Sequence, residues 1–181
     1  MKFSILLVVI TIGVAGHAFA CKCGGPWSVK EEFEDSELIF HGKVISKELV
    51  TIQETLKQDQ LSSLKQKLKG DTEKLQFLES HPIYEVKFEI IETYKGAVIR
   101  DTVTIYTATK SASCGYKFDK DKAYIVYGTP LSDIRFMFLP DSDKYMTVEK
   151  EHTFWTNHCT RTTGYNKTEA AELGKLKMKG G

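Results

Sequence analysis

The sequence predicts a mostly β fold: a small antiparallel barrel with flanking helices and a helical insertion after the first strand. Three observations predict it. Short segments alternate apolar and polar residues at period two, which is typical of half-buried strands. Turn residues such as Lys95-Gly96 and Pro130 separate these segments. Two leucine-containing stretches have helical spacing instead, one between the first two predicted strands and one at the end of the chain.

The predicted strands are short and follow one another along the chain. The clearest places Tyr84, Val86, Phe88 and Ile90 on one face, with charged residues between them. Five or six such strands favour a small antiparallel barrel over a parallel sheet. We expect strands over 38–45, 84–90, 102–106 and 123–128, and edge strands over 134–138 and 145–148.

The helical insertion is expected over residues 49–79. Leucine and isoleucine recur there at three- and four-residue spacing, with Lys, Gln and Glu between them. Gly70 ends a first helix, and Asp71 can cap a shorter second one. We expect the leucine stripe to pack on the barrel; the alternative is a partner-binding arm.

A second helix is expected over 168–177, with Thr168 as its N-cap. Ala170, Leu173 and Leu176 would face inward, and lysines at the end would complement the helix dipole. Asn166-Lys167-Thr168 is a sequon that predicts N-glycosylation at Asn166 in a eukaryotic host.

The first twenty residues have the pattern of a signal peptide. Lys2 is followed by an apolar stretch to about Ala15, and Ala18-Phe19-Ala20 gives the small-x-small motif before Cys21. The stretch is too short for a good membrane span. We therefore expect residues 1–20 to be removed and residues 21–181 to form one secreted, extracellular domain without a membrane span.

Four cysteines, Cys21, Cys23, Cys114 and Cys159, lie in the expected mature chain. In an oxidising compartment an even number indicates two disulfides, with three connectivities. Cys21 and Cys23 are too close to bridge one another comfortably. Each is therefore expected to reach one of the two distant cysteines.

Neither charge nor motifs indicate an enzyme or a nucleic-acid partner. The formal net charge is +1, and removal of Lys2 would neutralise it. The sequence has no glycine-rich phosphate loop, Gly-x-Ser-x-Gly elbow or His-Glu-x-x-His motif. His152 and His158 with Cys159 match no structural zinc spacing. We expect a non-enzyme with no cofactor of its own.

Cleavage before Cys21 would create a free α-amine with a pKa of about 8. That amine and the Cys21 carbonyl oxygen can form a five-membered chelate on a metal, such as a catalytic zinc that keeps one position open. Disulfides at 21 and 23 would order the segment before binding. From these residues alone, the favoured interpretation is an N-terminus that the disulfides hold in place for structural reasons only.

An ordered set of motifs resembles the tissue inhibitors of metalloproteinases and the wider netrin-like domain family. The set covers almost the whole mature chain. It comprises Cys21-x-Cys23, Tyr94-Lys95-Gly96, Ile105-Tyr106-Thr107-Ala108, Ser111-Ala112-Ser113-Cys114-Gly115, Lys122 to Gly128, and Cys159-Thr160-Arg161-Thr162.

The resemblance implies a five-stranded barrel of the oligonucleotide/oligosaccharide-binding type, with disulfides Cys21–Cys114 and Cys23–Cys159. It also implies that Cys21 chelates the zinc of a secreted or membrane-bound metalloendopeptidase, while Lys22 enters the specificity pocket. The inhibitory wedge would then comprise Cys21, Lys22, Cys23, Ala112, Ser113 and Cys114, carried by a monomer.

Two departures from the family pattern favour a rival interpretation. Lys22 stands where the inhibitors carry a small Thr or Ser, and an unpaired ammonium is costly to bury in an apolar pocket. Gly24-Gly25 adds flexibility where the wedge should be stiff. The rival is a non-inhibitory netrin-like module that binds extracellular matrix or a signalling protein.

Overall fold

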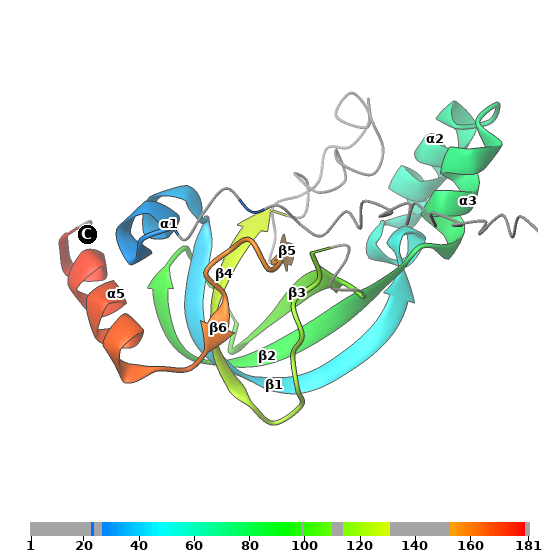
Figure 1. The fold of residues 1–181 in the computed structure, drawn as a ribbon. Coiled ribbons are helices and arrows are strands. Elements are labelled where there is room, and N and C mark those ends of the chain that lie inside the picture. The colour runs from blue at the N-terminus through cyan, green and yellow to red at the C-terminus, as the bar shows by residue number, and fades with distance from the viewer. Residues whose placement is uncertain (1–22, 24–26, 99, 110–113, 131–152, 180–181) are drawn as a thin grey trace, which may run out of the picture.

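The computed structural model describes residue 23 and residues 27–98, 100–109, 114–130 and 153–179. The chain builds one six-stranded sheet with helices at both of its ends (Figure 1). In chain order the elements are α1 Val29–Asp35, β1 Leu38–Thr51, the 3-10 helix η1 Ile52–Thr55, α2 Gln58–Lys67, α3 Thr72–Ser80, β2 Pro82–Lys95, β3 Thr102–Ala108, β4 Ala123–Pro130, β5 Thr153–Trp155, β6 Thr163–Gly164 and α5 Lys167–Lys179.

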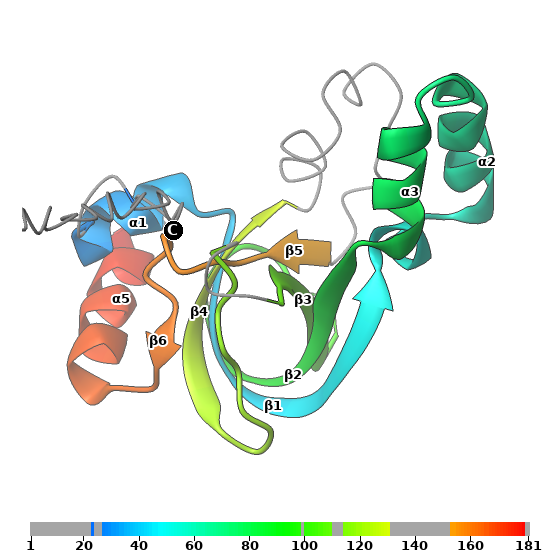
Figure 2. The ribbon, with the colours of Figure 1, turned by 45° about the vertical axis from the view of Figure 1, so that its right-hand side comes forward.

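Five of the strands close into a ring, which confirms the predicted mostly β, barrel-like fold. The sheet runs β1-β2-β3-β5-β4-β6, and an added β1–β4 pairing closes the first five strands of this order into the ring, with β6 at its edge (Figure 2). Most pairs are antiparallel, as predicted. β5 differs, because it lies parallel to β3 while pairing antiparallel with β4.

Strand β1 curls so that it can pair with β2 on one edge and β4 on the other. Three register shifts with β2 interrupt its ladder, and such bulges bend a strand. Gly42 lies between two of them, where a Cβ would come within 2.7 Å of the Phe40 ring and 2.9 Å of the Glu89 carbonyl oxygen. The close approach of β2 at this bend therefore requires glycine.

The inward faces of the strands make the main core. Phe40, Phe88 and Phe118 are fully or almost fully buried, and Phe88 packs edge-on against the other two rings. Alternation along β2 places Val86 and Phe88 in this core, as the period-two pattern predicts. Tyr116 packs beside the cluster, and burial raises the pKa of its phenol to about 12.

The helical insertion lies between β1 and β2, as predicted, but begins three residues later. Residues 49–51 continue β1, with Leu49 opposite Tyr84. Leu64 of α2 and Leu78 of α3 are buried in a cluster that includes Tyr106 and Trp155. The expectation that the leucine stripe packs on the sheet is thus confirmed.

The C-terminal helix α5 packs beside α1 at the end of the sheet opposite the insertion (Figures 1 and 2). Leu173 is buried there, and Ala170 and Leu176 pack against the same cluster, as predicted. The predicted cap was wrong: α5 begins at Lys167, and the Oδ1 atom of Asn166 accepts the Glu169 N–H at 2.8 Å. Asn outranks Thr as an N-cap, which is the physical reason.

Some predicted elements lie outside the described residues, namely the leader 1–20 and the edge strands 134–138 and 145–148. Within the described part of the chain, no helix is long and apolar enough to cross a membrane.

Candidate functional site

The loop after β5 carries Cys159 and holds it in a tight turn. Asn157 Oδ1 accepts the backbone N–H groups of Cys159, at 2.7 Å, and of Thr160, at 3.2 Å. The Thr160 hydroxyl in turn donates to the Asn157 carbonyl oxygen at 2.8 Å. Asn favours such side-chain-to-backbone turns because its amide oxygen replaces a backbone acceptor.

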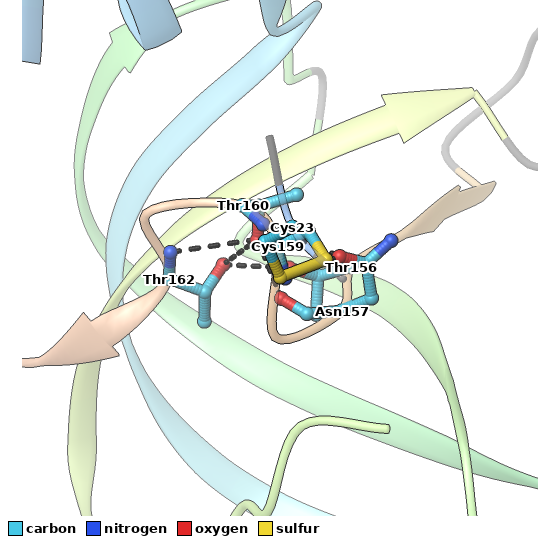
Figure 3. Close-up of a disulfide and its surroundings, with 6 residues drawn as sticks. All are labelled: Cys23, Thr156, Asn157, Cys159, Thr160 and Thr162. Carbon is cyan, nitrogen blue, oxygen red and sulfur yellow. Dashed lines mark hydrogen bonds between the residues drawn. A yellow bond between two sulfur atoms is a disulfide. The ribbon is translucent and has the colours of Figure 1, made fainter. Parts of the chain in front are cut away.

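Cys159 forms a disulfide with Cys23, with Cα atoms 5.0 Å apart (Figure 3). The bond spans 136 residues of sequence, so it ties the start of the described chain to the loop between β5 and β6. This is one of the two pairings that the family resemblance implies, and it is confirmed.

Three threonine hydroxyls of this loop hydrogen-bond to one another (Figure 3), and two of them, on Thr156 and Thr162, also bind strand β4. Thr156 donates to the Tyr127 carbonyl oxygen at 2.9 Å, and Thr162 accepts the Tyr127 N–H at 3.0 Å. The hydroxyls of Thr156 and Thr162 lie 2.6 Å apart, and that of Thr160 lies 2.9 Å from Thr156. Thr156 is fully buried, so these bonds satisfy groups that water does not reach.

The same loop contacts the segment that carries Cys114. The backbone N–H of His158 donates to the Cys114 carbonyl oxygen at 2.8 Å, and the His158 ring packs against Tyr116. Cys114 has a φ of 62°, a left-handed conformation that is uncommon outside glycine. Cys114 is also disulfide-bonded.

We call this arrangement the N-terminal anchor, defined by Cys23, Cys114, His158 and Cys159. Of the predicted wedge residues it contains Cys23 and Cys114. The others, Cys21, Lys22, Ala112 and Ser113, lie outside the described residues, and so does the Cys21–Cys114 pairing. The anchor therefore brings together the described part of the predicted wedge.

A pocket of about 290 Å³ lies against the disulfide. Its polar lining includes Arg161 and Glu169, whose ion pair measures 3.1 Å from Nη2 to Oε2. Trp27 contributes an indole that is 40% exposed. The lining is Cys23, Trp27, His158, Cys159, Thr160, Arg161, Thr163 and Glu169.

Sequence reasoning assigned no role to Arg161, Glu169 or Trp27. Arg161 precedes β6 and Glu169 lies in α5, so no period of a single helix or strand relates the two residues. Trp27 lies 134 positions from Arg161. No local sequence signal could have joined these residues; only the disulfide between Cys23 and Cys159 hints at their proximity.

Asn166 is exposed where the strand β6 leads into α5. Its Oδ1 atom is the helix cap, whereas a glycan would be attached to its Nδ2 atom. Glycosylation at Asn166 stays a prediction. Among the described residues, no three His, Cys, Asp or Glu side chains are arranged to hold a metal ion.

Comparisons with known proteins add no relative. No protein-family model matches the chain, and a search of curated proteins also finds no match.

Proposed function

We propose that this chain is a secreted metalloproteinase inhibitor of the tissue-inhibitor type, which acts through its mature N-terminus. The α-amine and carbonyl oxygen of Cys21 would chelate the catalytic zinc of a target metalloendopeptidase and displace its bound water. One observation carries the proposal: the N-terminal anchor gathers Cys23, Cys114 and Cys159 at one loop.

The short chain between Cys21 and Cys23 makes a Cys21–Cys114 disulfide feasible. Cys21 is two residues from the anchored Cys23, and two residues span at most about 7 Å. A disulfide needs Cα atoms about 4.4–6.8 Å apart. Cys114 lies beside the same loop, one hydrogen bond from His158, so it is a partner within reach of Cys21.

Preorganisation is the energetic reason for such an anchor. A free N-terminal segment would lose conformational entropy on binding, about 1–2 kcal/mol for each residue that becomes ordered. The Cys23–Cys159 disulfide removes part of that loss before any partner arrives. An anchored chain end therefore binds a metal more tightly than a free one.

The rival function is a netrin-like binding module without inhibitory activity. The ammonium of Lys22 favours it, because burial of that charge in an apolar pocket is costly. Under this alternative the anchor only braces the barrel, and the partner is extracellular matrix or a signalling protein.

The test compares two forms of the protein, one beginning at Cys21 and one with an extra Ala before it. The added residue converts the α-amine into an amide, which cannot chelate zinc in the same way. We expect the native form to block at least one zinc endopeptidase from a broad panel and the extended form to lose that inhibition. Equal inhibition by both forms, or none by either, would refute chelation.

A further inference from the structure

Arg161 joins the N-terminal segment to the body of the protein. Its Nη1 atom donates to the Trp27 carbonyl oxygen. Its Nε and Nη2 atoms donate to the two carboxylate oxygens of Glu169, at 3.3 and 3.1 Å. Its backbone N–H and its charge also act on the carboxyl of Glu32 in α1, whose pKa they lower. One residue thus binds the N-terminal segment and α5 and influences a carboxyl of α1.

Glu169 gives the guanidinium a fixed orientation. Its side chain is only 9% exposed, and it also accepts a hydrogen bond from the buried Tyr127 hydroxyl at 2.7 Å. Burial alone would lower the pKa of Arg161, but the contacts with Glu169 and Tyr127 outweigh burial and raise it. The planar fork matches a carboxylate at two points, which a lysine ammonium cannot do.

The N-terminal segment is therefore held at two points by one loop. Cys159 holds Cys23 covalently, and Arg161, two residues later, holds the Trp27 carbonyl. The threonine hydroxyls at 156 and 162 fix that loop to β4. The three intervening residues, 24–26, lie outside the described residues, and their sequence begins with Gly24-Gly25.

A single disulfide fixes the position of a segment but lets it swivel, particularly beside two glycines. A second attachment point, four residues away, restricts its direction. We infer that Arg161 is the positioning residue of the proposed inhibitory site: with the disulfide, it sets the direction in which the chain before Cys23 leaves the barrel. This inference rests on the proposed function, because it assigns a residue to the orientation of that wedge.

Trp27 supplies a spectroscopic probe for this hold. Its side chain is 40% exposed, whereas Trp155, the other tryptophan, is 2% exposed in the core. A soluble quencher such as acrylamide therefore reaches Trp27 in preference to Trp155.

The alternative is that Arg161 only braces α1 against α5. In that case its replacement would change stability but would leave zinc-dependent inhibition unchanged.

The experiment uses the chain that begins at Cys21, as wild type and as the variants Arg161→Gln, Arg161→Lys and Arg100→Gln. Arg100 is an exposed arginine outside the anchor, so its variant is the matched control. A thiol assay first establishes that the disulfides are intact. Acrylamide quenching and the inhibition constant against an endopeptidase that the wild type blocks are then measured.

We expect Arg161→Gln to increase acrylamide quenching and to weaken inhibition about tenfold, because the wedge must be ordered on binding. Arg161→Lys should fall between that variant and wild type, since lysine keeps the charge without the fork. Arg100→Gln should match wild type in both measurements.

If Arg161→Gln inhibits the endopeptidase as strongly as wild type does, the inference is overturned, even when quenching increases. If the wild type blocks no endopeptidase, the proposed function fails by itself. In that case unchanged quenching in Arg161→Gln would overturn the inference too, whereas increased quenching would still support the hold of Arg161 on the N-terminal segment.

Discussion

The backbone N–H of His158 donates to the carbonyl oxygen of Cys114, and this bond of 2.8 Å joins two loops that are far apart in sequence. This hydrogen bond brings Cys114 close to a second pair of cysteines, because Cys159 follows His158 and is bound to Cys23. Three of the four cysteines thus surround one turn of the chain. The arrangement makes the Cys23–Cys159 disulfide the first target for mutation.

We predict that the double substitution Cys23→Ser and Cys159→Ser lowers the free energy of unfolding by about 2–5 kcal/mol. The bond closes a loop of 136 residues, so its removal frees much conformational entropy in the unfolded chain. Urea denaturation at neutral pH measures the change. A loss below about 0.5 kcal/mol would show that the bond does not stabilise the fold.

The buried hydrogen bond from Tyr127 to Glu169 leads to a second prediction. Tyr127→Phe removes a donor 2.7 Å from a nearly buried carboxylate, and should cost about 1–3 kcal/mol of unfolding free energy. Tyr165→Phe is the control: Tyr165 is 42% exposed, and we expect its variant to stay within about 0.5 kcal/mol of wild type. Similar losses in the two variants would contradict the prediction.

Glu32 gives a prediction about pH. Burial raises the pKa of its carboxyl, and nearby Asp35 adds to the rise, while the Arg161 N–H and charge oppose it. The folded state then binds the proton more tightly than the unfolded state, so the Glu32 contribution to stability falls as pH rises through the raised pKa. Glu32→Gln should be more stable than wild type at pH 7, with the difference vanishing below about pH 4.

Thermal or urea unfolding between pH 4 and 8 tests this. Glu34→Gln, on the same helix with a side chain 63% exposed, is the matched control and should follow wild type throughout. A Glu32→Gln variant that is less stable than wild type at pH 7 would contradict the sign of the prediction.

His41 should produce a pH dependence of the opposite sign. Burial lowers the pKa of its imidazole, against a smaller opposing effect of Glu92. The unfolded chain therefore protonates first, and stability is lost as pH falls below about 6.5 toward the folded-state pKa. His41→Phe keeps a ring stacked on Tyr165, whose centroid lies 4.0 Å away. Unfolding curves of this variant should lack the loss between pH 7 and 5; an unchanged loss would assign it to other groups.

The parts of this structure that were predictable from sequence are those with a local cause. Alternation in β2 places Val86 and Phe88 inward, because the period of a strand is two. Helix α1 was not predicted because its seven residues are too few to show a period. Its sequence does contain a helix-start signal, since Ser28 and Glu31 form a capping box. Strands β5 and β6, of three and two residues, are too short to show a period. The parallel β3–β5 pairing and the Arg161–Glu169–Trp27 contacts depend on tertiary closure, which no window of sequence reveals.

Lys22 is the residue that most directly tests the proposed wedge geometry, because it departs from the family pattern. If the side chain after Cys21 enters an apolar specificity pocket, its ammonium loses hydration without gaining a partner. Lys22→Thr should then strengthen inhibition of endopeptidases with apolar pockets by about tenfold or more, which corresponds to about 1.4 kcal/mol. Enzymes with acidic pockets should lose inhibition instead. The control is Lys30→Thr, because the Lys30 side chain is 70% exposed on α1 and is not one of the predicted wedge residues. The inhibition constants are measured against one enzyme of each kind. If inhibition of the enzyme with the apolar pocket is unchanged or weaker, residue 22 does not enter that pocket.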